Sequence, residues 1–268
     1  MHDVSDMDAR NARSNYDVKE QIREYWSRRS QTFDQSPAHG IHSQNELESW
    51  QRLIGDNAQG IGNGRVLELA SGTGEFTRVL RALGCQVEGL DISEAMIRNA
   101  REKHGGDVKF HLGDAENTML PDGLFDAVVC RHLVWTLLDP ENAFGDWLRI
   151  LKPGGRLIII DGNWQHQAYA AKLAAQVARI WDRFAPRKPL YDAEAHRLIQ
   201  AQLFFRDGLS TTLLIEMLGK AGFAQVHSGP LKGVLASQLR AANWRDRLDL
   251  LQSQGRSFIV SAQRPSEI

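Results

Sequence analysis

Apolar positions in the central part of the chain fall into short strand-sized runs. Each run is followed by a stretch in which apolar residues recur every three or four positions, which is the spacing of an amphipathic helix. The strand-sized runs cover residues 66–69, 85–91, 108–112, 125–130 and 156–161. Strands that alternate with helices in this way form a parallel sheet covered by helices on both faces. We therefore predict a doubly wound α/β fold.

The residues before the first strand predict helices. Residues 1–18 are polar and of mixed charge, so we expect a flexible arm there. Residues 19–60 carry an aromatic and apolar helical face, and a second helix is expected from about Ser43. The face either packs on the core or forms a lid over a ligand site, in which Tyr25 or Arg29 would reach a ligand carboxylate.

Residues 61–163 hold the five strands and would form the core of the domain. We expect residues 164–209 to form a helical insertion that contains a long amphipathic helix. Residues 210–268 would return to the sheet with two further strands, 223–231 and 257–262, and one helix between them. The prediction is therefore a seven-stranded sheet that is mostly parallel, and the resemblance described below implies an antiparallel last strand.

Charge and composition exclude several classes of function. A formal net charge of −1 argues against a protein that grips nucleic acid through its phosphates. Cys85 and Cys130 are too few for a disulfide framework and favour a cytoplasmic location. No apolar run is long enough to span a bilayer. His39 and His42 have no further ligand cluster nearby, so we expect no metal site.

The segment between the first strand and its helix has the composition of a nucleotide-binding turn. Gly72 and Gly74 allow backbone to approach a ligand closely, and the helix that follows offers free N–H groups. The dinucleotide fingerprint is incomplete, because Thr77 stands where the last glycine would be. An acidic residue, Glu68, instead lies four positions before Gly72.

Acidic residues follow the next two strands. Asp91 ends the second strand, where a carboxylate can accept two hydrogen bonds from ribose hydroxyls. Asp114 follows the third strand and can accept from an exocyclic amine, while the Ala115 backbone can address the edge of a base. Ile92 and Met96 begin the helix after Asp91, and Met96 either lies in the core or touches an adenine ring.

Five motifs in this order resemble the class I S-adenosylmethionine-dependent methyltransferases, in particular their ubiquinone/menaquinone-methyltransferase-like group, which acts on small molecules. The resemblance is strong over residues 20–160 and looser beyond. The motifs are ELASGTG at 68–74, LDISEAM at 90–96, GDA at 113–115, FDAVV at 125–129 and LKPGG at 151–155. Together they form a specific signal, although each alone is weak.

The resemblance implies a Rossmann-like fold, S-adenosylmethionine as cofactor, and roles for matching positions. Gly72 and Gly74 would line the methionine portion, with Glu68 or the Ala70 carbonyl near its amino group. The insertion would cover the substrate, and the segment with Tyr25 and Arg29 would be the lid. The full set of expected cofactor residues is Tyr25, Arg29, Glu68, Ala70, Gly72, Gly74, Asp91, Ile92, Met96, Asp114, Ala115 and Arg131.

The methyl acceptor requires different residues. A sulfonium methyl is already electrophilic, so the protein mainly needs to orient a nucleophile, which is worth about 7–11 kcal/mol in well-arranged systems. His132 follows the fourth strand and would act as base for a hydroxyl or protonated amine, or would only form a hydrogen bond. His166 and His196 are weaker candidates. The expected aromatic walls of the acceptor pocket are Trp135, Trp164, Tyr191 and Phe204.

Three other functions stay open at this point. The first is a non-catalytic protein that binds the cofactor in order to regulate or scaffold a partner. The second, a nicotinamide-dependent dehydrogenase, rests only on the glycine turn and Asp91. A nucleic-acid methyltransferase is disfavoured by the charge and by the lack of an Asn-Pro-Pro-aromatic signature. The acceptor, which could be quinone-like or a secondary metabolite, and its reacting atom are not fixed, and the first helix could exchange between subunits of a homo-oligomer.

Overall fold

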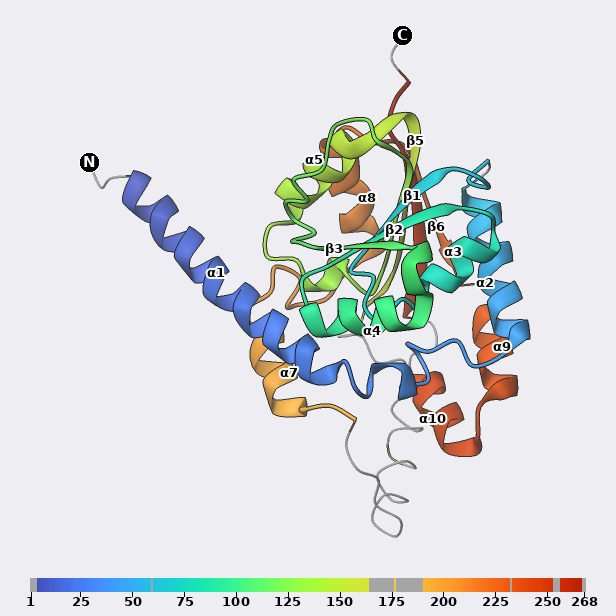
Figure 1. The fold of residues 1–268 in the computed structure, drawn as a ribbon. Coiled ribbons are helices and arrows are strands. Elements are labelled where there is room, and N and C mark those ends of the chain that lie inside the picture. Colours follow the sequence, from blue (N-terminus) through green and yellow to red (C-terminus); the bar gives the residue numbers. More distant parts are fainter. Residues whose placement is uncertain are drawn as a thin grey trace.

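A seven-stranded sheet forms the centre of the protein in a computed structural model (Figure 1). The structure describes residues 4–58, 60–163, 190–231, 233–252 and 256–266, together with Gln176. The strand order is β3-β2-β1-β4-β5-β7-β6. The strands are β1 (Arg65–Leu69), β2 (Gln86–Asp91), β3 (Lys109–Leu112), β4 (Phe125–Arg131), β5 (Leu151–Gly162), β6 (Ala224–Pro230) and β7 (Ser257–Gln263).

Strand direction confirms the predicted fold. The pairs β1–β2, β1–β4, β2–β3 and β4–β5 are parallel, whereas β7 runs antiparallel to both β5 and β6. Leu69, at the end of β1, is in register with Leu90 of β2 and Cys130 of β4. The residues that follow these positions, including Asp91 and Arg131, therefore meet at one edge of the sheet.

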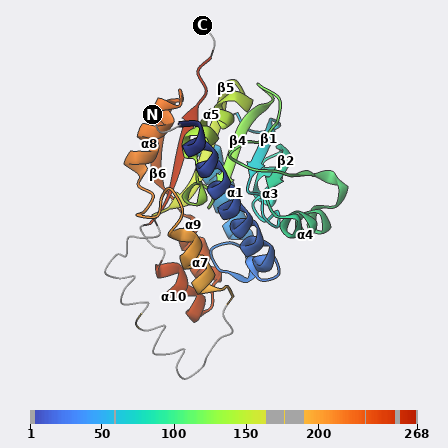
Figure 2. The same ribbon diagram turned by 90° about the vertical axis from the view of Figure 1, so that its left-hand side faces the viewer.

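Helices cover both faces of the sheet, because the strand side chains alternate between two apolar layers (Figures 1 and 2). In β4, Val128 and Cys130 lie in one layer and Ala127 and Val129 in the other. The first layer is completed by α5 (Pro140–Ile150) and α8 (Thr211–Lys220). The second is completed by α2 (Gln44–Asn57), α3 (Thr77–Ala82) and α9 (Val234–Ala241). Helix α4 (Glu94–His104) packs on β3.

The amino-terminal helix differs from the expectation. Helix α1 spans Val4–Arg29, so the arm expected over residues 1–18 is helical from residue 4. Figure 1 shows its first half projecting away from the sheet, and α7 (Ala193–Gln200) lies beside its second half. The helix extends because Met, Ala and Arg in this polar stretch favour helix without an apolar face. A short 3₁₀ turn, Phe33–Gln35, follows it.

Two other boundaries differ from the predictions. Strand β5 begins at Leu151 instead of residue 156, because Leu151 already pairs with Phe125 of β4. The single helix expected between the last two strands is two helices, α9 and α10 (Trp244–Gln252). The Asn243 side chain accepts hydrogen bonds from the backbone of Arg245 and Asp246 at 3.0 Å, which begins a new helix there. The long helix expected within the insertion lies outside the described residues.

Both cysteines are buried and free, as their apolar surroundings suggested. Of the helices in the described part of the chain, none combines the length and apolar character required to cross a membrane.

Candidate active site

A cavity with about 790 Å³ of empty space, part of it open to solvent, lies at the carboxyl ends of β1, β2 and β4. Helix α1 and the loop of residues 30–42, which we call the lid loop, border it on the other side. The predicted residues in its wall are Ala70, Gly72, Asp91, Ile92, Met96, Asp114, Ala115, Arg131 and His132. The wall residues that sequence reasoning did not assign to the site are Lys19, Ile22, Trp26, Phe33, His39, Leu90, Glu116, Leu133, Thr136 and Leu137.

The glycine turn divides into a ligand-facing and a structural part. Ala70 and Gly72 have φ angles of 49° and 54°, and both line the cavity. Gly74 also has a positive φ, 78°, but does not line it. A Cβ on Gly74 would lie 2.7 Å from Nε2 of His104, which makes a 2.8 Å hydrogen bond with the Gly74 carbonyl. Gly74 is therefore required for the packing of α4, whereas Gly72 is in place for a ligand.

Glu68 does not line the cavity but lies beneath the glycine turn that does. It is buried under the turn, and the Thr77 hydroxyl donates a hydrogen bond to its carboxyl group. Burial raises the pKa of Glu68 to about 8, so the group is mostly protonated at neutral pH. The threonine that breaks the dinucleotide fingerprint therefore provides a partner for a buried acid.

Asp91 is held at the centre of the cavity wall. Its two carboxylate oxygens accept hydrogen bonds from the backbone N–H groups of Gly72 and Ser93, both at 2.8 Å. Burial raises the pKa of Asp91 to about 6, against backbone hydrogen bonds from Ser93, Gly72 and Ile92, which lower it. A carboxylate offers about four acceptor positions, so Asp91 keeps acceptor capacity for a ligand hydroxyl.

One end of the cavity is acidic and is occupied by a lysine. Lys19 of α1 lies 2.5 Å from Oδ2 of Asp114 and 2.8 Å from Oε2 of Glu116. The pKa of Lys19 is raised, because hydrogen bonds and charge attraction from these two acids outweigh its burial. The free protein thus holds an ammonium group at the position where an exocyclic amine was expected.

His132 is poorly suited to take a proton. It follows β4 with a left-handed φ of 59°, and its backbone N–H donates to the carbonyl of Ile160 at 2.8 Å. Burial, and then the charge of Arg131, lowers the pKa of the His132 imidazole to about 3. The ring is neutral at physiological pH and is a weak base there. Its catalytic role stays a prediction.

Tyr25 and Arg29 lie behind the wall rather than in it. Tyr25 of α1 packs against α7, and its hydroxyl lies 3.1 Å from Nδ1 of His196. Burial raises the pKa of Tyr25 to about 12, so it stays protonated. Arg29 is 6% exposed, and its guanidinium lies over the Tyr191 ring, 5.3 Å from the centroid. A contact of either residue with the cofactor stays a prediction.

Of the expected aromatic walls, the three that the structure describes do not line the cavity. Trp135 is partly buried, and its Nε1 donates to the His132 carbonyl at 3.0 Å. Tyr191 and Phe204 are 47% and 50% exposed. Trp164 and His166 lie outside the described residues. The aromatic side chains that do line the cavity, Trp26 and Phe33, belong to α1 and the lid loop.

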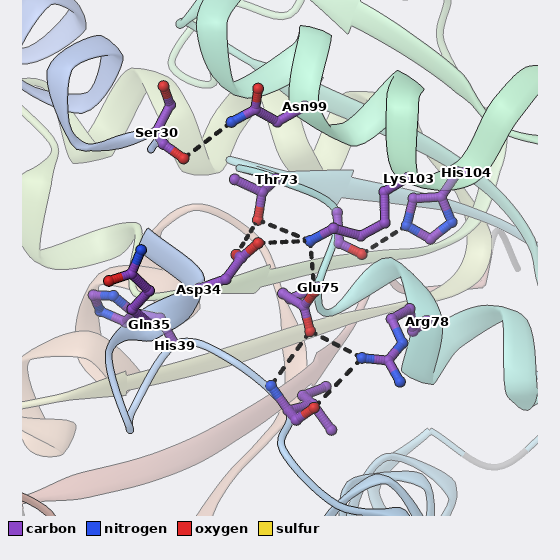
Figure 3. Close-up of polar contacts among 12 residues, drawn as sticks. Ser30, Asp34, Gln35, His39, Thr73, Glu75, Arg78, Asn99, Lys103 and His104 are labelled. Atoms are coloured by element: carbon purple, nitrogen blue, oxygen red, sulfur yellow. Dashed lines mark hydrogen bonds and ion pairs between the residues drawn. The ribbon is translucent and has the colours of Figure 1, made fainter. Parts of the chain in front are cut away.

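A polar network fastens the lid loop to the core (Figure 3). The Lys103 ammonium lies 2.9 Å from Asp34 of the lid loop and 2.5 Å from Glu75, which follows the glycine turn. Asp34 also accepts a hydrogen bond from the Thr73 hydroxyl. Glu75 in turn accepts from the backbone N–H of Ile41 at 3.3 Å. These contacts tie the lid loop to the glycine turn and to α4.

No group of three or more histidine, cysteine, aspartate or glutamate side chains with the arrangement of a metal site occurs within the described ranges.

Comparison with known proteins points to one group of enzymes. Residues 67–159 match the family model described as a methyltransferase domain. The chain is 38% identical over 117 residues to a demethylmenaquinone methyltransferase from Thermus thermophilus, covering 42% of this chain and 53% of that one. It therefore spans about half the length of that relative. It is 30% identical over 200 residues to a ubiquinone/menaquinone biosynthesis C-methyltransferase from Yersinia pestis, covering 69% of this chain and 76% of that protein.

A solved structure shows the same fold. Phosphoethanolamine N-methyltransferase 2 from Haemonchus contortus, in complex with S-adenosyl-L-methionine, matches with a TM-score of 0.56 at 18% identity. The match covers 82% of this chain and 53% of that chain.

Proposed function

Because the chain belongs to the class I S-adenosylmethionine-dependent methyltransferases, in their ubiquinone/menaquinone-methyltransferase-like group, we propose that it transfers a methyl group to a small-molecule acceptor bound in the cavity described above. One observation carries this proposal. One cavity is lined by residues at the ends of three different strands, Gly72, Asp91 and Asp114. The backbone N–H of Gly72 also donates a hydrogen bond to the Asp91 carboxylate.

The polar groups in the wall fit the parts of S-adenosylmethionine. Asp91 retains acceptor capacity for the ribose hydroxyls, and the Gly72 backbone in the cavity wall would lie beside the methionine portion. Asp114 and Ala115 would meet the adenine, with Met96 as part of an apolar wall. The indole Nε1 of Trp147 donates to the Ala115 carbonyl at 2.7 Å, which fixes the turn that places Ala115 there.

The protein would contribute orientation rather than proton transfer. The cofactor supplies a methyl group on a positively charged sulfur, and alignment of a nucleophile with it is worth about 7–11 kcal/mol. His39 and His132, the histidines in the wall, both have lowered pKa values because of burial, so neither is a strong base. We therefore propose acceptors that are nucleophilic without such help: a neutral amine, or an acceptor that ionises readily by itself.

The names of the relatives suggest the first acceptor to try. The Yersinia pestis protein is named as a C-methyltransferase of quinone biosynthesis, so a ring carbon of a quinol is our first candidate. Such a ring is electron-rich, so its carbon can be nucleophilic, which agrees with the lowered basicity of His39 and His132 among the described wall residues. Oxygen and nitrogen acceptors are the alternatives.

Binding and turnover test the proposal in two steps. Thermal unfolding should show stabilisation by S-adenosylmethionine and S-adenosylhomocysteine but not by NAD. Release of S-adenosylhomocysteine is then measured with a short-chain demethylmenaquinol, phenols and primary amines as acceptors. Stabilisation by NAD alone would contradict the proposal. Tight cofactor binding without turnover of any acceptor would favour a regulatory or scaffold protein.

A further inference from the structure

A cluster of basic side chains lies at and behind the cavity wall near the end of β4. We define the basic corner as Arg29, His39 and Arg131. His39 and Arg131 line the cavity beside Gly72, and Arg29 lies directly behind His39. Within the described residues, neither guanidinium forms an ion pair with a carboxylate. Two buried cations without an anion are costly unless a ligand supplies one.

Arg29 determines which nitrogen of His39 carries the proton. Its Nη2 lies 3.2 Å from Nδ1 of His39 and donates to Oγ of Ser36 at 2.9 Å. A guanidinium can only donate, so Nδ1 must accept and the proton of the neutral ring lies on Nε2. Burial and neighbouring positive charges keep the pKa of His39 well below its usual range, so the ring stays neutral. The polar group that His39 has left for a ligand is therefore an N–H donor.

The His39 ring is also fixed in space. Phe33 stacks on it, with centroids 4.4 Å apart and planes 16° from parallel. Asp34, one residue from Phe33, is anchored to Thr73 and Lys103 (Figure 3). The donor is thus held before any ligand arrives, which reduces the entropy lost on binding.

Arg131 supplies a second donor at the same place. Its Nη2 donates to the His39 carbonyl, and its guanidinium lies 5.1 Å from the ring centroid of Phe76 and 5.6 Å from that of Trp50. Its Nη1 is buried and has no hydrogen-bond partner. Glu68 is the strongest nearby negative influence on Arg131, but its own raised pKa leaves it mostly protonated at neutral pH. A positively charged donor in the cavity wall is therefore left for a ligand.

We propose that Nε2–H of His39 and Nη1–H of Arg131 form a two-donor site for an anionic oxygen, with Arg29 as the positioning residue. The proposal rests on the proposed function, since it concerns the same cavity. The oxygen belongs either to the carboxylate of the cofactor or to an anionic methyl acceptor, because both present the same chemistry at this end. A hydrogen bond between a charged donor and a carboxylate is about twice as strong as a neutral one.

The first arm of the test compares two ligands by calorimetry. S-adenosylhomocysteine carries the carboxylate, and 5′-methylthioadenosine lacks the whole amino-acid part. If the site holds the cofactor carboxylate, Arg131→Met and His39→Asn should each lower the affinity for S-adenosylhomocysteine about 10- to 100-fold. Neither substitution should change the affinity for 5′-methylthioadenosine. His39→Gln is the matched control, because its amide N–H can take the place of Nε2–H and should restore most of the affinity.

The second arm uses protein saturated with S-adenosylhomocysteine. If the site holds an anionic acceptor, 4-hydroxybenzoate should bind more tightly than 4-hydroxybenzamide, and Arg131→Met should remove the difference. The cofactor affinities of the first arm would then be unchanged. No effect of either substitution in either arm would overturn the proposal. Failure of the unaltered protein to bind S-adenosylhomocysteine would instead contradict the proposed function.

A measurement on the unaltered protein covers the case in which a variant does not fold. Long-range ¹H–¹⁵N spectra of the imidazole groups distinguish the two neutral tautomers. Nε2 of His39 should be protonated, and its shift should change when S-adenosylhomocysteine or 4-hydroxybenzoate is added. A proton on Nδ1, or no shift with either ligand, would overturn the assignment.

Discussion

Cofactor affinity should increase with pH through the ionisation of Asp91. This carboxyl is 6% exposed, and its burial raises the pKa to about 6. Ribose hydroxyls donate hydrogen bonds, so binding requires the ionised form. Below pH 6 the proton must be removed first, and each further pH unit should weaken binding about tenfold, or about 1.4 kcal/mol. Above pH 7 the affinity should be constant.

The stability of the protein without ligand should respond to Asp91 with the opposite sign. Its pKa in the folded state lies above the ordinary value of 3.8, so the folded state binds the proton more tightly. The resulting stabilisation is fully present below pH 3.8 and is lost as the pH rises through 6. The pKa shift corresponds to a decrease in the free energy of unfolding on the order of 3 kcal/mol between low and neutral pH.

Calorimetric titration with S-adenosylhomocysteine at pH 5, 6, 7 and 8 measures the first effect, and urea unfolding over pH 4–7 measures the second. Asp91→Asn should weaken binding at pH 8 about 10- to 100-fold and remove both pH dependences. Asp56→Asn, on the exposed side of α2, is the matched control and should leave both unchanged. An affinity of the unaltered protein that is flat between pH 5 and 8, or an Asp91→Asn variant that keeps the dependence, would refute the reasoning.

Three further substitutions test the surroundings of the cavity. Lys19→Met frees the acids at one end of the cavity and should tighten S-adenosylhomocysteine about two- to five-fold by calorimetry; weaker binding would contradict this. Lys103→Met removes a cation shared by two acids, so it should lower the free energy of unfolding in urea by about 1–2 kcal/mol and speed proteolysis of the lid loop. The same substitution at the exposed Lys109 should change neither. Gly74→Ala should lower the free energy of unfolding by about 2–4 kcal/mol, because its Cβ would clash with His104 and its φ is positive. Gly145→Ala has open space around it and should leave the stability unchanged or raise it slightly.

The sequence was most informative where local pattern and ligand chemistry coincide. Gly72, Asp91 and Asp114 each follow a strand, and parallel strands bring their carboxyl ends to one edge whatever the details of packing. The strand-sized runs could be predicted from the local pattern, whereas the direction of the antiparallel last strand followed from the resemblance to the family. The period of the pattern within each strand already separates the two layers of the core.

The residues added by the structure come from segments whose position the pattern does not fix. Lys19 lies beside the apolar face of its helix, which does not indicate its partners, and these partners, Asp114 and Glu116, are almost a hundred positions away. His39 belongs to a loop, and only its contacts with Arg29 and Phe33 distinguish it from a solvated histidine. One sequence signal could have been used: a histidine two residues after a proline, between two helices that both carry aromatic side chains.

The predicted aromatic walls stay a prediction, and Trp135, Tyr191 and Phe204 do not line this cavity. Large aromatic side chains bury much apolar area wherever they lie, so their identity does not say which surface they cover. Trp135 fills space beside His196, and Tyr191 lies against Arg29, so both support the lid from outside the cavity.

A crystal structure of the protein with S-adenosylhomocysteine tests the central claim most directly. The ribose hydroxyls should lie within hydrogen-bond distance of Asp91, the adenine beside Asp114 and Ala115, and the amino-acid part beside Gly72. A ligand bound away from the ends of β1, β2 and β4, or a ribose with no contact to Asp91, would contradict the account.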